Sequence, residues 1–497
     1  MNFSSRIFAL FTLFIFWTCS SLSGQQFNGH LNSDFSGVVG VRANPSFVAN
    51  SPYKFDFSLL NGNAYASSNI GNLITTNEST LFIRQFEPKQ KYIQINAALG
   101  GFSGLISLPK KRGIAFQYGL RTHANGTDIS QNFVYQVDRF DDLSFRNTSF
   151  SDESFELSTM IWQEFALTYG GILKESGFGR WKIGATLKLI NPSGHVWVDL
   201  EGADYVIDNN GFATFDQFDI SAGNSSNLDR YEYIDGNNPL QGLPKGIGLQ
   251  FGGIDVGVTY EQLLDKPNPT TRQGTRVERD IDYQFRLSVA LTDIGMASFE
   301  HGSVAFTNVN ADSNLDYDDV IDLLEDASSL RGYRNVIDTL VQTADLSGAY
   351  TVSLPAAFRL NFDHNFDDNF YLGVSTVLDL SGLMPTDYRV SYANSITLTP
   401  RYETGRKGFY LPLFYNLNGE TQLGMAMRYG PLTVGTHALQ TIFSSERDTV
   451  GLFFNISFNL LKANSKKSYC FGSSKTGSAL VSKKRTPQYK RKKFIFF

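Results

Sequence analysis

Apolar and polar residues alternate with a period of two along most of this chain. In the run 181–189 apolar side chains take every second position, and Lys182, Gly184, Thr186 and Lys188 lie between them. Similar runs occur at 53–59, 114–121, 254–260, 283–292, 358–363 and 452–460. Because successive side chains of a strand point to opposite faces, this pattern predicts strands with one apolar and one polar face.

The length of these runs favours a membrane protein. The longest of them reach about nine to eleven residues, the length that a tilted strand needs to cross the hydrocarbon core of a membrane. Lipid offers no partner for backbone N–H and C=O groups, so strands within it must close into a ring. We estimate about 14 strands, with roughly 12 to 18 possible. We therefore predict an all-β fold, a closed antiparallel transmembrane β-barrel over residues 53–460.

Three stretches interrupt the alternation. Residues 25–52 are polar and rich in glycine, and we interpret them as a plug or hatch segment. Residues 208–245 and 306–347 are predicted to be long loops, the kind that bacterial barrels place on their outer side. Within the second loop, Val320, Leu323 and Leu324 recur at helical spacing and predict one or two short helices.

The N-terminus is typical of an exported protein. Arg6 is the only charged residue among the first 33, and an apolar run follows from Ile7 to Trp17. This run is too short to span a membrane, which takes about 20 residues, so we interpret residues 1–24 as a signal peptide. A membrane anchor and a lipoprotein signal at Cys19 are the alternatives. An exported barrel predicts the outer membrane of a Gram-negative bacterium.

Composition and charge agree with an exported β-rich protein. The 497 residues include 42 Phe and 23 Tyr, too many aromatic residues for a disordered chain. A mean hydropathy of −0.19 argues against a bundle of membrane helices. Residues 462–497 hold 11 Lys and Arg and no acidic residue, whereas the rest holds 32 basic and 48 acidic residues. The basic tail, 461–497, is predicted to be disordered, or else to contact anionic lipid; nucleic acid is not expected as a partner outside the cytoplasm.

The polar faces of the predicted strands carry charges of both signs, which should point into the barrel. They are Lys54, Arg121, Lys182, Lys188, Arg286, Arg359 and Arg401 together with Asp56, Glu164, Asp255 and Asp363. Such an interior either interlocks through ion pairs or lines a water-filled channel, and the sequence leaves both possibilities open.

The last predicted strand resembles the C-terminal recognition signal of outer-membrane barrels. Thr449 and Gly451 precede Phe454, Ile456 and Phe458, which alternate along the strand. An unpaired strand edge of this kind would be offered to the barrel-assembly machinery, with membrane lipid as the other expected partner. The tail beyond residue 461 is a departure from the usual position of this signal. An ordinary amphipathic strand is the alternative.

No pattern of catalytic, metal-binding or cofactor-binding residues emerges from the sequence. The six His residues lack zinc-site spacing, and neither a nucleophile elbow nor a phosphate-binding glycine loop occurs. Asp312, Asn314, Asp316 and Asp318 have the spacing of the first EF-hand ligands, but Tyr317 stands where that loop needs Gly. We therefore predict neither an enzyme nor a metal or cofactor site.

Three short motifs resemble those of fatty-acid-transporter-type (FadL-like) barrels. Arg42-Ala43-Asn44-Pro45-Ser46 looks like their Asn-Pro-Ala element, with Ser46 in place of Ala. The segments 291–295 (LTDIG) and 353–355 (SLP) are also similar, and the likeness extends over about residues 25–460. Taken together, the chain resembles a family of outer-membrane barrels of the Bacteroidetes type whose function is unknown.

The resemblance implies a barrel with residues 25–52 folded inward as a hatch, and passage or uptake of small hydrophobic compounds. About 14 strands enclose more space than wall side chains fill, since roughly eight already leave a filled interior. Because fold does not fix function, a barrel that anchors or scaffolds envelope or secretion machinery is the alternative, with an envelope protein as its partner.

Overall fold

A computed structural model gives the fold. It describes residues 29–70, 74–75, 91–130, 132, 146–176, 178–209, 213–231, 245–263, 283–310, 314–315, 330–340, 342–366, 369–417, 420–439, 446–447 and 449–461. The predicted signal peptide, nearly all of the basic tail, and residues 320–324 lie outside this part of the chain.

Strands dominate the described residues. In the first half they are β1 (Tyr53–Ser68), β2 (Ile74–Thr75), β3 (Lys91–Gly100), β4 (Ser103–Leu108), β5 (Arg112–Ile129), β6 (Thr148–Glu175), β7 (Gly179–Ile207), β8 (Ala213–Asn224) and β9 (Gln250–Leu263). In the second half they are β10 (Tyr283–Glu300), β11 (Phe306–Asn310), β12 (Asn314–Leu315), β13 (Gln342–Asp345), β14 (Ala349–Ser353), β15 (Ala357–Asn365), β16 (Phe370–Asp379), β17 (Tyr388–Arg389), β18 (Ser395–Glu403), β19 (Lys407–Tyr410), β20 (Leu413–Asn416), β21 (Glu420–Leu423), β22 (Met425–Tyr429), β23 (Leu432–Thr436), β24 (Glu446–Arg447) and β25 (Thr449–Leu461).

The helices are short. They are η1 (Asp34–Ser36), η2 (Val39–Arg42), η3 (Pro45–Val48), η5 (Ser226–Tyr231), α4 (Leu330–Leu340) and η7 (Ser381–Leu383). None of the helices in the described ranges is long and apolar enough to cross a membrane. Helix α4 lies within residues 306–347, where the sequence predicts a short helix.

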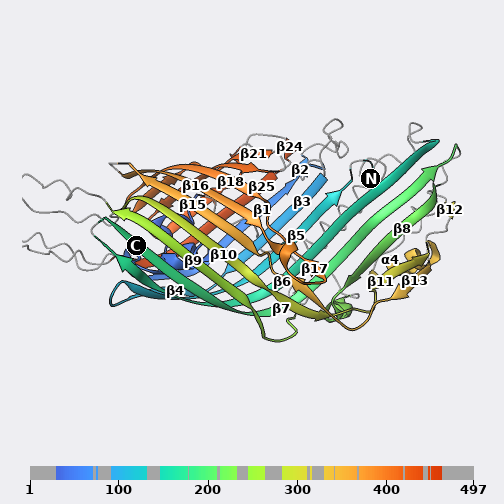
Figure 1. Ribbon diagram of the computed structural model, residues 1–497, viewed down its shortest axis with the longest axis horizontal. Coiled ribbons are helices and arrows are strands. Elements are labelled where there is room, and N and C mark those ends of the chain that lie inside the picture. Colours follow the sequence, from blue (N-terminus) through green and yellow to red (C-terminus); the bar gives the residue numbers. More distant parts are fainter. Residues whose placement is uncertain are drawn as a thin grey trace, which may run out of the picture.

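The strands close into an antiparallel ring (Figure 1). Its 14 members, in order, are β1, β3 with β4, β5, β6, β7, β9, β10, β15, β16, β18, β19 with β20, β21 with β22, β23 and β25. The first and last members meet along a seam that pairs Tyr53 with Leu461 and Ser67 with Thr449. The predicted closed barrel of about 14 strands is therefore confirmed.

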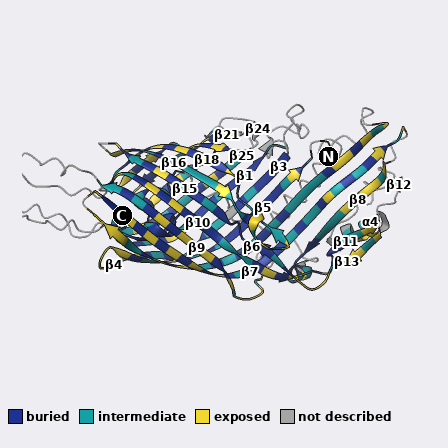
Figure 2. Ribbon diagram, in the orientation of Figure 1, coloured by how far each residue is buried: buried dark blue, intermediate teal, exposed yellow. Residues whose placement is uncertain are grey.

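The ring has an apolar outside and a polar inside. Along β7, Trp181, Ile183 and Leu187 are exposed, whereas Lys182 and Lys188 are buried. Figure 2 shows this alternation as a chequered pattern along the strands. An exterior of exposed apolar side chains is stable against lipid and not against water, so the ring is a transmembrane barrel.

Bulges correct the predicted facing of three residues. A shift in the pairing of β1 with β25 between Tyr53 and Phe55 leaves Lys54 exposed, so Lys54 does not line the lumen as predicted. The same shift turns Tyr53 inward, and a shift at the start of β10 does so for Tyr283. An extra residue in one strand reverses the alternation beyond it. The other ten predicted lumen charges are buried.

Strands β6 and β7 are longer than the predicted crossing length because they continue beyond the ring. The half of β7 after Ile190 pairs with β8 instead of β9, and β8 pairs in turn with β11. Figure 1 shows these strands, with β13 and α4, projecting from one end of the barrel. We name this projection the outer extension. Residues 208–245 were predicted to be a loop throughout, and this prediction is wrong for the part that forms strand β8.

Candidate functional site

Residues 29–52, which we call the N-terminal segment, lie against the inner surface of the barrel. Asp56 of β1 accepts a hydrogen bond from the Val38 N–H at 2.7 Å, and Gln117 of β5 donates one to the Val38 carbonyl at 2.6 Å. On the other side, Asp34 and Arg286 of β10 form an ion pair with N···O of 2.7 Å. Contacts on several strands hold the segment across the lumen.

The same segment also reaches β18 and β19. Ser33 hydrogen-bonds Glu403, and the His30 imidazole lies 3.2 Å from the Tyr410 hydroxyl. Burial lowers the pKa of His30 to about 3, so this ring is neutral in neutral solution. The contact is therefore a hydrogen bond between neutral groups.

The predicted motif 42–46 packs against strands β9 and β10 of the wall. Asn44 caps η3, because its side-chain oxygen accepts from the Ser46 N–H at 2.9 Å. The amide of Asn44 donates to the Val289 carbonyl of β10 at 3.1 Å. Ser46 Oγ lies 2.6 Å from Thr259 Oγ1 of β9. Pro45 begins the helix, a position that suits its missing N–H.

Four glycines in the wall make room for η3. Gly113, Gly170, Gly184 and Gly257 stand directly opposite one another across β5, β6, β7 and β9. We call them the glycine row. A Cβ on Gly184 would lie 2.5 Å from the Pro45 carbonyl carbon and 2.7 Å from the Ser46 nitrogen. Only residues without a side chain allow the backbone of η3 to approach this closely.

A group of buried charges lies next to this segment inside the barrel. We call it the inner charge cluster, and it consists of Arg121, Glu164, Lys188, Asp255 and Asp293. Arg121 pairs with Glu164 at 2.7 Å and with Asp293 at 2.6 Å. Lys188 pairs with Asp255 at 2.7 Å and with Asp293 at 2.6 Å. The predicted mixed lumen charges thus interlock through ion pairs at this level.

The 291–295 motif explains how Asp293 reaches the cluster. The pairing of β10 with β9 shifts between Leu291 and Ile294, and Asp293 has a φ of 58°. Asp tolerates this left-handed conformation better than most residues do. The bulge lets two successive residues, Thr292 and Asp293, both be buried, and Arg121 and Lys188 bind the carboxylate.

Residues 380–394, which we call the strap, cross the lumen from strands β16 and β18 to strands β5 and β6. They connect β16 with β18 and contact strands halfway round the ring: Arg389 pairs with Glu156 of β6 at 2.7 Å, and the Ser391 N–H donates to Asn125 of β5 at 3.0 Å. The Tyr392 hydroxyl accepts from Arg121 at 2.8 Å. The inner charge cluster therefore contacts the strap.

The cluster also acts on the N-terminal segment. Arg42 lies at the end of η2, and its guanidinium is attracted chiefly by the carboxylate of Glu164. With Arg42 included, three cations face three carboxylates. One balanced group of charges thus joins the N-terminal segment, the wall and the strap.

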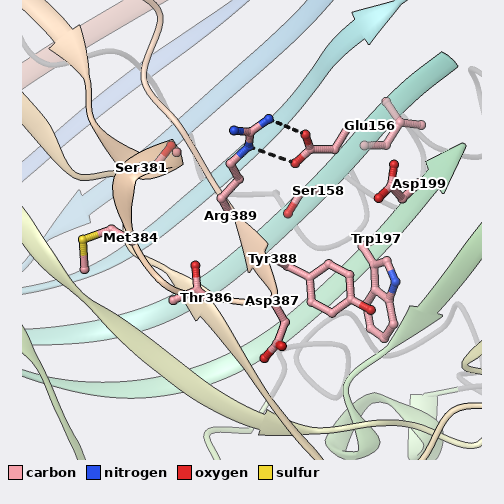
Figure 3. Close-up of a pocket in the computed structure, with 12 residues that line it drawn as sticks. Glu156, Ser158, Trp197, Asp199, Ser381, Met384, Thr386, Asp387, Tyr388 and Arg389 are labelled. Atoms are coloured by element: carbon pink, nitrogen blue, oxygen red, sulfur yellow. Dashed lines mark hydrogen bonds and ion pairs between the residues drawn. The ribbon is translucent and has the colours of Figure 1, made fainter. Parts of the chain in front are cut away.

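A cavity of about 230 Å³ lies between the strap and the wall (Figure 3). We call it the strap pocket. Opposite the strap it is lined by Glu156 and Ser158 of β6 with Trp197 and Asp199, which belong to the half of β7 that pairs with β8, and its strap side includes Tyr388. This volume is below the ~300 to 1,000 Å³ typical of sites for drug-sized ligands, so it suits a small molecule.

Aromatic rings form the floor beside the pocket. The ring centroids of Trp197 and Tyr388 are 4.5 Å apart, and Tyr350 of β14 lies 5.1 Å from Trp197. These rings belong to a buried cluster with Trp162, Phe299 and other apolar residues. No group of three or more His, Cys, Asp or Glu in the described ranges is placed to hold a metal ion.

The residues of the predicted assembly signal lie in the seam. Thr449 and Gly451 face inward, and Thr449 Oγ1 lies 2.9 Å from Ser67 Oγ of β1. Phe454, Ile456 and Phe458 point to the other face of β25, and Phe458 is exposed. The pattern agrees with lipid contact, while recognition by assembly machinery stays a prediction.

A family model described as a family of unknown function (DUF5723) matches residues 45–437. The chain belongs to this family. The match covers most of this DUF5723 protein's barrel and begins at Pro45 of the predicted motif. No curated protein matches the chain.

Several solved structures are similar to this DUF5723 protein at low identity. The Ralstonia pickettii toluene transporter TbuX is 10% identical, with 86% of this chain and 94% of that chain covered and a TM-score of 0.35. For the Pseudomonas putida toluene transporter TodX the values are 10%, 88%, 97% and 0.36. For a Pseudomonas aeruginosa FadL homologue they are 9%, 89%, 96% and 0.33.

Sequence reasoning missed the strap, the strap pocket and the glycine row. The available signal for the glycine row was that Gly184 and Gly257 both occupy predicted polar-face positions, where a missing side chain leaves room inside the barrel. Their common height depends on how four strands pair, which the sequence alone does not give.

Proposed function

We propose that this protein is an outer-membrane barrel for the gated passage of small hydrophobic compounds, with the N-terminal segment as its hatch. The observation that carries the proposal is that two segments of the chain itself cross the lumen at different heights and share one charge cluster. A barrel used only as an anchor has no need for a lumen closed in this way. The proposal includes no catalytic step.

The strap pocket offers an apolar patch to such a passenger within a lining that is otherwise largely polar. Trp197, Tyr388 and Met384 give it an apolar wall close to the aromatic cluster. Apolar surface removed from water contributes about 25 cal/mol per Å², so a small aromatic molecule would gain affinity there. The pocket would be the first binding site on an inward route.

A reversible lock on the hatch tests this proposal. The Oγ atoms of Ser46 and Thr259 are 2.6 Å apart, so cysteines at both positions should form a disulfide, whose S–S bond is about 2.05 Å. The double variant S46C/T259C would be made in a C470S background. Cells expressing it would be assayed for uptake of radiolabelled propylbenzene, oxidised and then reduced.

The expected result is uptake that oxidation stops and a reductant restores, with each single-cysteine variant unaffected. Deleting residues 25–52 should raise uptake without the lock. If the oxidised double variant takes up propylbenzene as fast as the unmodified protein, the hatch does not gate passage. If no form exceeds cells without the barrel, passage itself is wrong.

The outer extension favours one alternative, a scaffold for an envelope partner. Strands β8 and β11 and helix α4 project past the ring, where they contribute nothing to the membrane-spanning wall (Figure 1). Co-purification of a stoichiometric envelope protein, lost on removal of residues 213–224, would support that role.

A further inference from the structure

The strap pocket carries an excess of negative charge. Three carboxylates line it, those of Glu156, Asp199 and Asp387, against the single guanidinium of Arg389. Arg389 is committed to Glu156, because its Nη2 and Nε donate to the two carboxylate oxygens at 2.7 and 3.3 Å. Asp387 accepts from the Thr351 N–H at 2.7 Å and from its hydroxyl at 2.9 Å.

Asp199, the third carboxylate of the pocket, has no such hydrogen-bonding partner among the described residues. It stands directly opposite Glu156 across β6 and β7, a placement of like charges that destabilises a sheet. Within the described part of the chain its carboxylate forms no hydrogen bond or ion pair, and its residue is half-buried. A cation bound beside it would relieve this repulsion and replace part of its lost hydration.

The aromatic side of the pocket adds a second, independent observation. Trp197 is 2% exposed and lines the cavity. The rings of Trp197 and Tyr388 lie beside the same cavity as Asp199, as Figure 3 shows. Aromatic faces attract cations, with Trp the strongest of them.

We propose that the strap pocket selects small hydrophobic molecules that carry a cationic amine, with the ammonium beside Asp199 and the apolar body against Trp197 and Tyr388. This inference rests on the proposed function for the route, but the binding itself does not require passage. It narrows the class of passenger from hydrophobic compounds in general to hydrophobic amines.

Two probes of the same shape, one charged and one neutral, separate the contribution of charge to binding from that of shape. Phenethylamine carries –NH₃⁺ where propylbenzene carries –CH₃, and binding of each to the detergent-solubilised full chain would be measured by calorimetry and by tryptophan fluorescence. We expect the amine to bind at least about tenfold more tightly. A tenfold difference corresponds to about 1.4 kcal/mol, which a hydrogen bond to a charged partner is sufficient to supply.

The decisive variant is Asp199→Asn, which keeps the shape of the side chain and removes the repulsion with Glu156, so the barrel should still fold. It should lose the preference for the amine and leave propylbenzene binding unchanged. Glu201→Gln is the matched control, because Glu201 lies on the same strand, is exposed and does not line the pocket. Heat-modifiable migration would verify that both variants are folded.

The outcomes separate this inference from the proposed function. Equal binding of the two probes, or an Asp199→Asn variant that keeps the preference, overturns the inference. Displacement of the amine by Ca²⁺ alone would overturn it in favour of a metal-ion site. If the amine binds as expected but neither probe is taken up by cells, the binding site stands and passage is wrong.

Discussion

Replacing Gly184 by Ala places a methyl group where the backbone of the N-terminal segment now lies. The new Cβ would stand 2.5 Å from the Pro45 carbonyl carbon and 2.7 Å from the Ser46 nitrogen. Non-bonded carbon atoms prefer about 3.5 to 4.0 Å, so η3 would have to move by about 1 Å. Because backbone atoms cannot rotate away as a side chain could, this change should dislodge η3 from the glycine row.

The cost can be set against the stability of the segment. Overpacking of this kind costs typically about 1 to 3 kcal/mol. A change of about 1 to 2 kcal/mol alters an equilibrium by about 5- to 30-fold, and the fraction of molecules with a displaced segment should rise by at least that factor. Strand pairing in the wall should persist, since the added methyl points into the lumen.

Two measurements would follow the displacement. Trypsin should cleave the folded variant faster after Arg42, and single-channel recordings should show more frequent opening. Gly104→Ala is the control, because a Cβ there has its nearest neighbour, the Asp56 carbonyl oxygen, at 3.8 Å. If Gly184→Ala is as resistant and as closed as the unmodified barrel, η3 is not held by close packing against the wall.

Three further predictions concern the wall, the charge cluster and the strap pocket. Phe454→Asp with Phe458→Asp should block assembly, because a charge facing lipid costs up to about 2 to 4 kcal/mol and less for Asp; normal heat-modifiable migration would contradict this. Asp293→Asn keeps a residue type that tolerates φ of 58° but removes one of the two carboxylate partners of Arg121 and of Lys188, which leaves the buried cluster with one uncompensated positive charge, so thermal unfolding in detergent should show a loss of about 3 to 5 kcal/mol; an unchanged melting temperature would contradict it. Burial, together with the charges of Glu156 and Glu201, raises the pKa of Asp199 to about 6 despite the opposing charge of Arg389. Because Asp199 becomes protonated as the pH drops from 7.5 to 5, the affinity for phenethylamine should fall over this range, and Asp199→Asn should abolish this dependence.

The barrel itself could be predicted because lipid makes strict demands. Every outward residue of a crossing strand must be apolar, so the alternation in Trp181–Leu189 and its counterparts is strong and long. Backbone pairing in lipid leaves closure as the solution, and the number of runs gives the number of strands. These constraints act on each strand separately, and the sequence therefore carries them locally.

The interior could be predicted only in part, since it depends on how distant strands meet. The inward facing of Arg121 and Asp255 follows from alternation, but their shared partners do not. Lys54 was misplaced because a bulge is set by the pairing of β1 with β25. Trp197 and Tyr388 are far apart in sequence, and no local pattern links them before the strap folds across the lumen.

Closure of the seam between β1 and β25 limits when the N-terminal segment can enter the barrel during assembly. The N-terminal segment precedes every strand of the wall in the chain, yet Tyr410 and Glu403, which bind it, belong to strands of the second half of the ring. Once Tyr53 and Leu461 have paired, the cylinder has no remaining lateral entrance between its first and last members. Capture of the segment while the wall is still an open sheet avoids its insertion through an end of the closed cylinder, so a delay in capture would leave a finished cylinder with its interior unfilled by the segment.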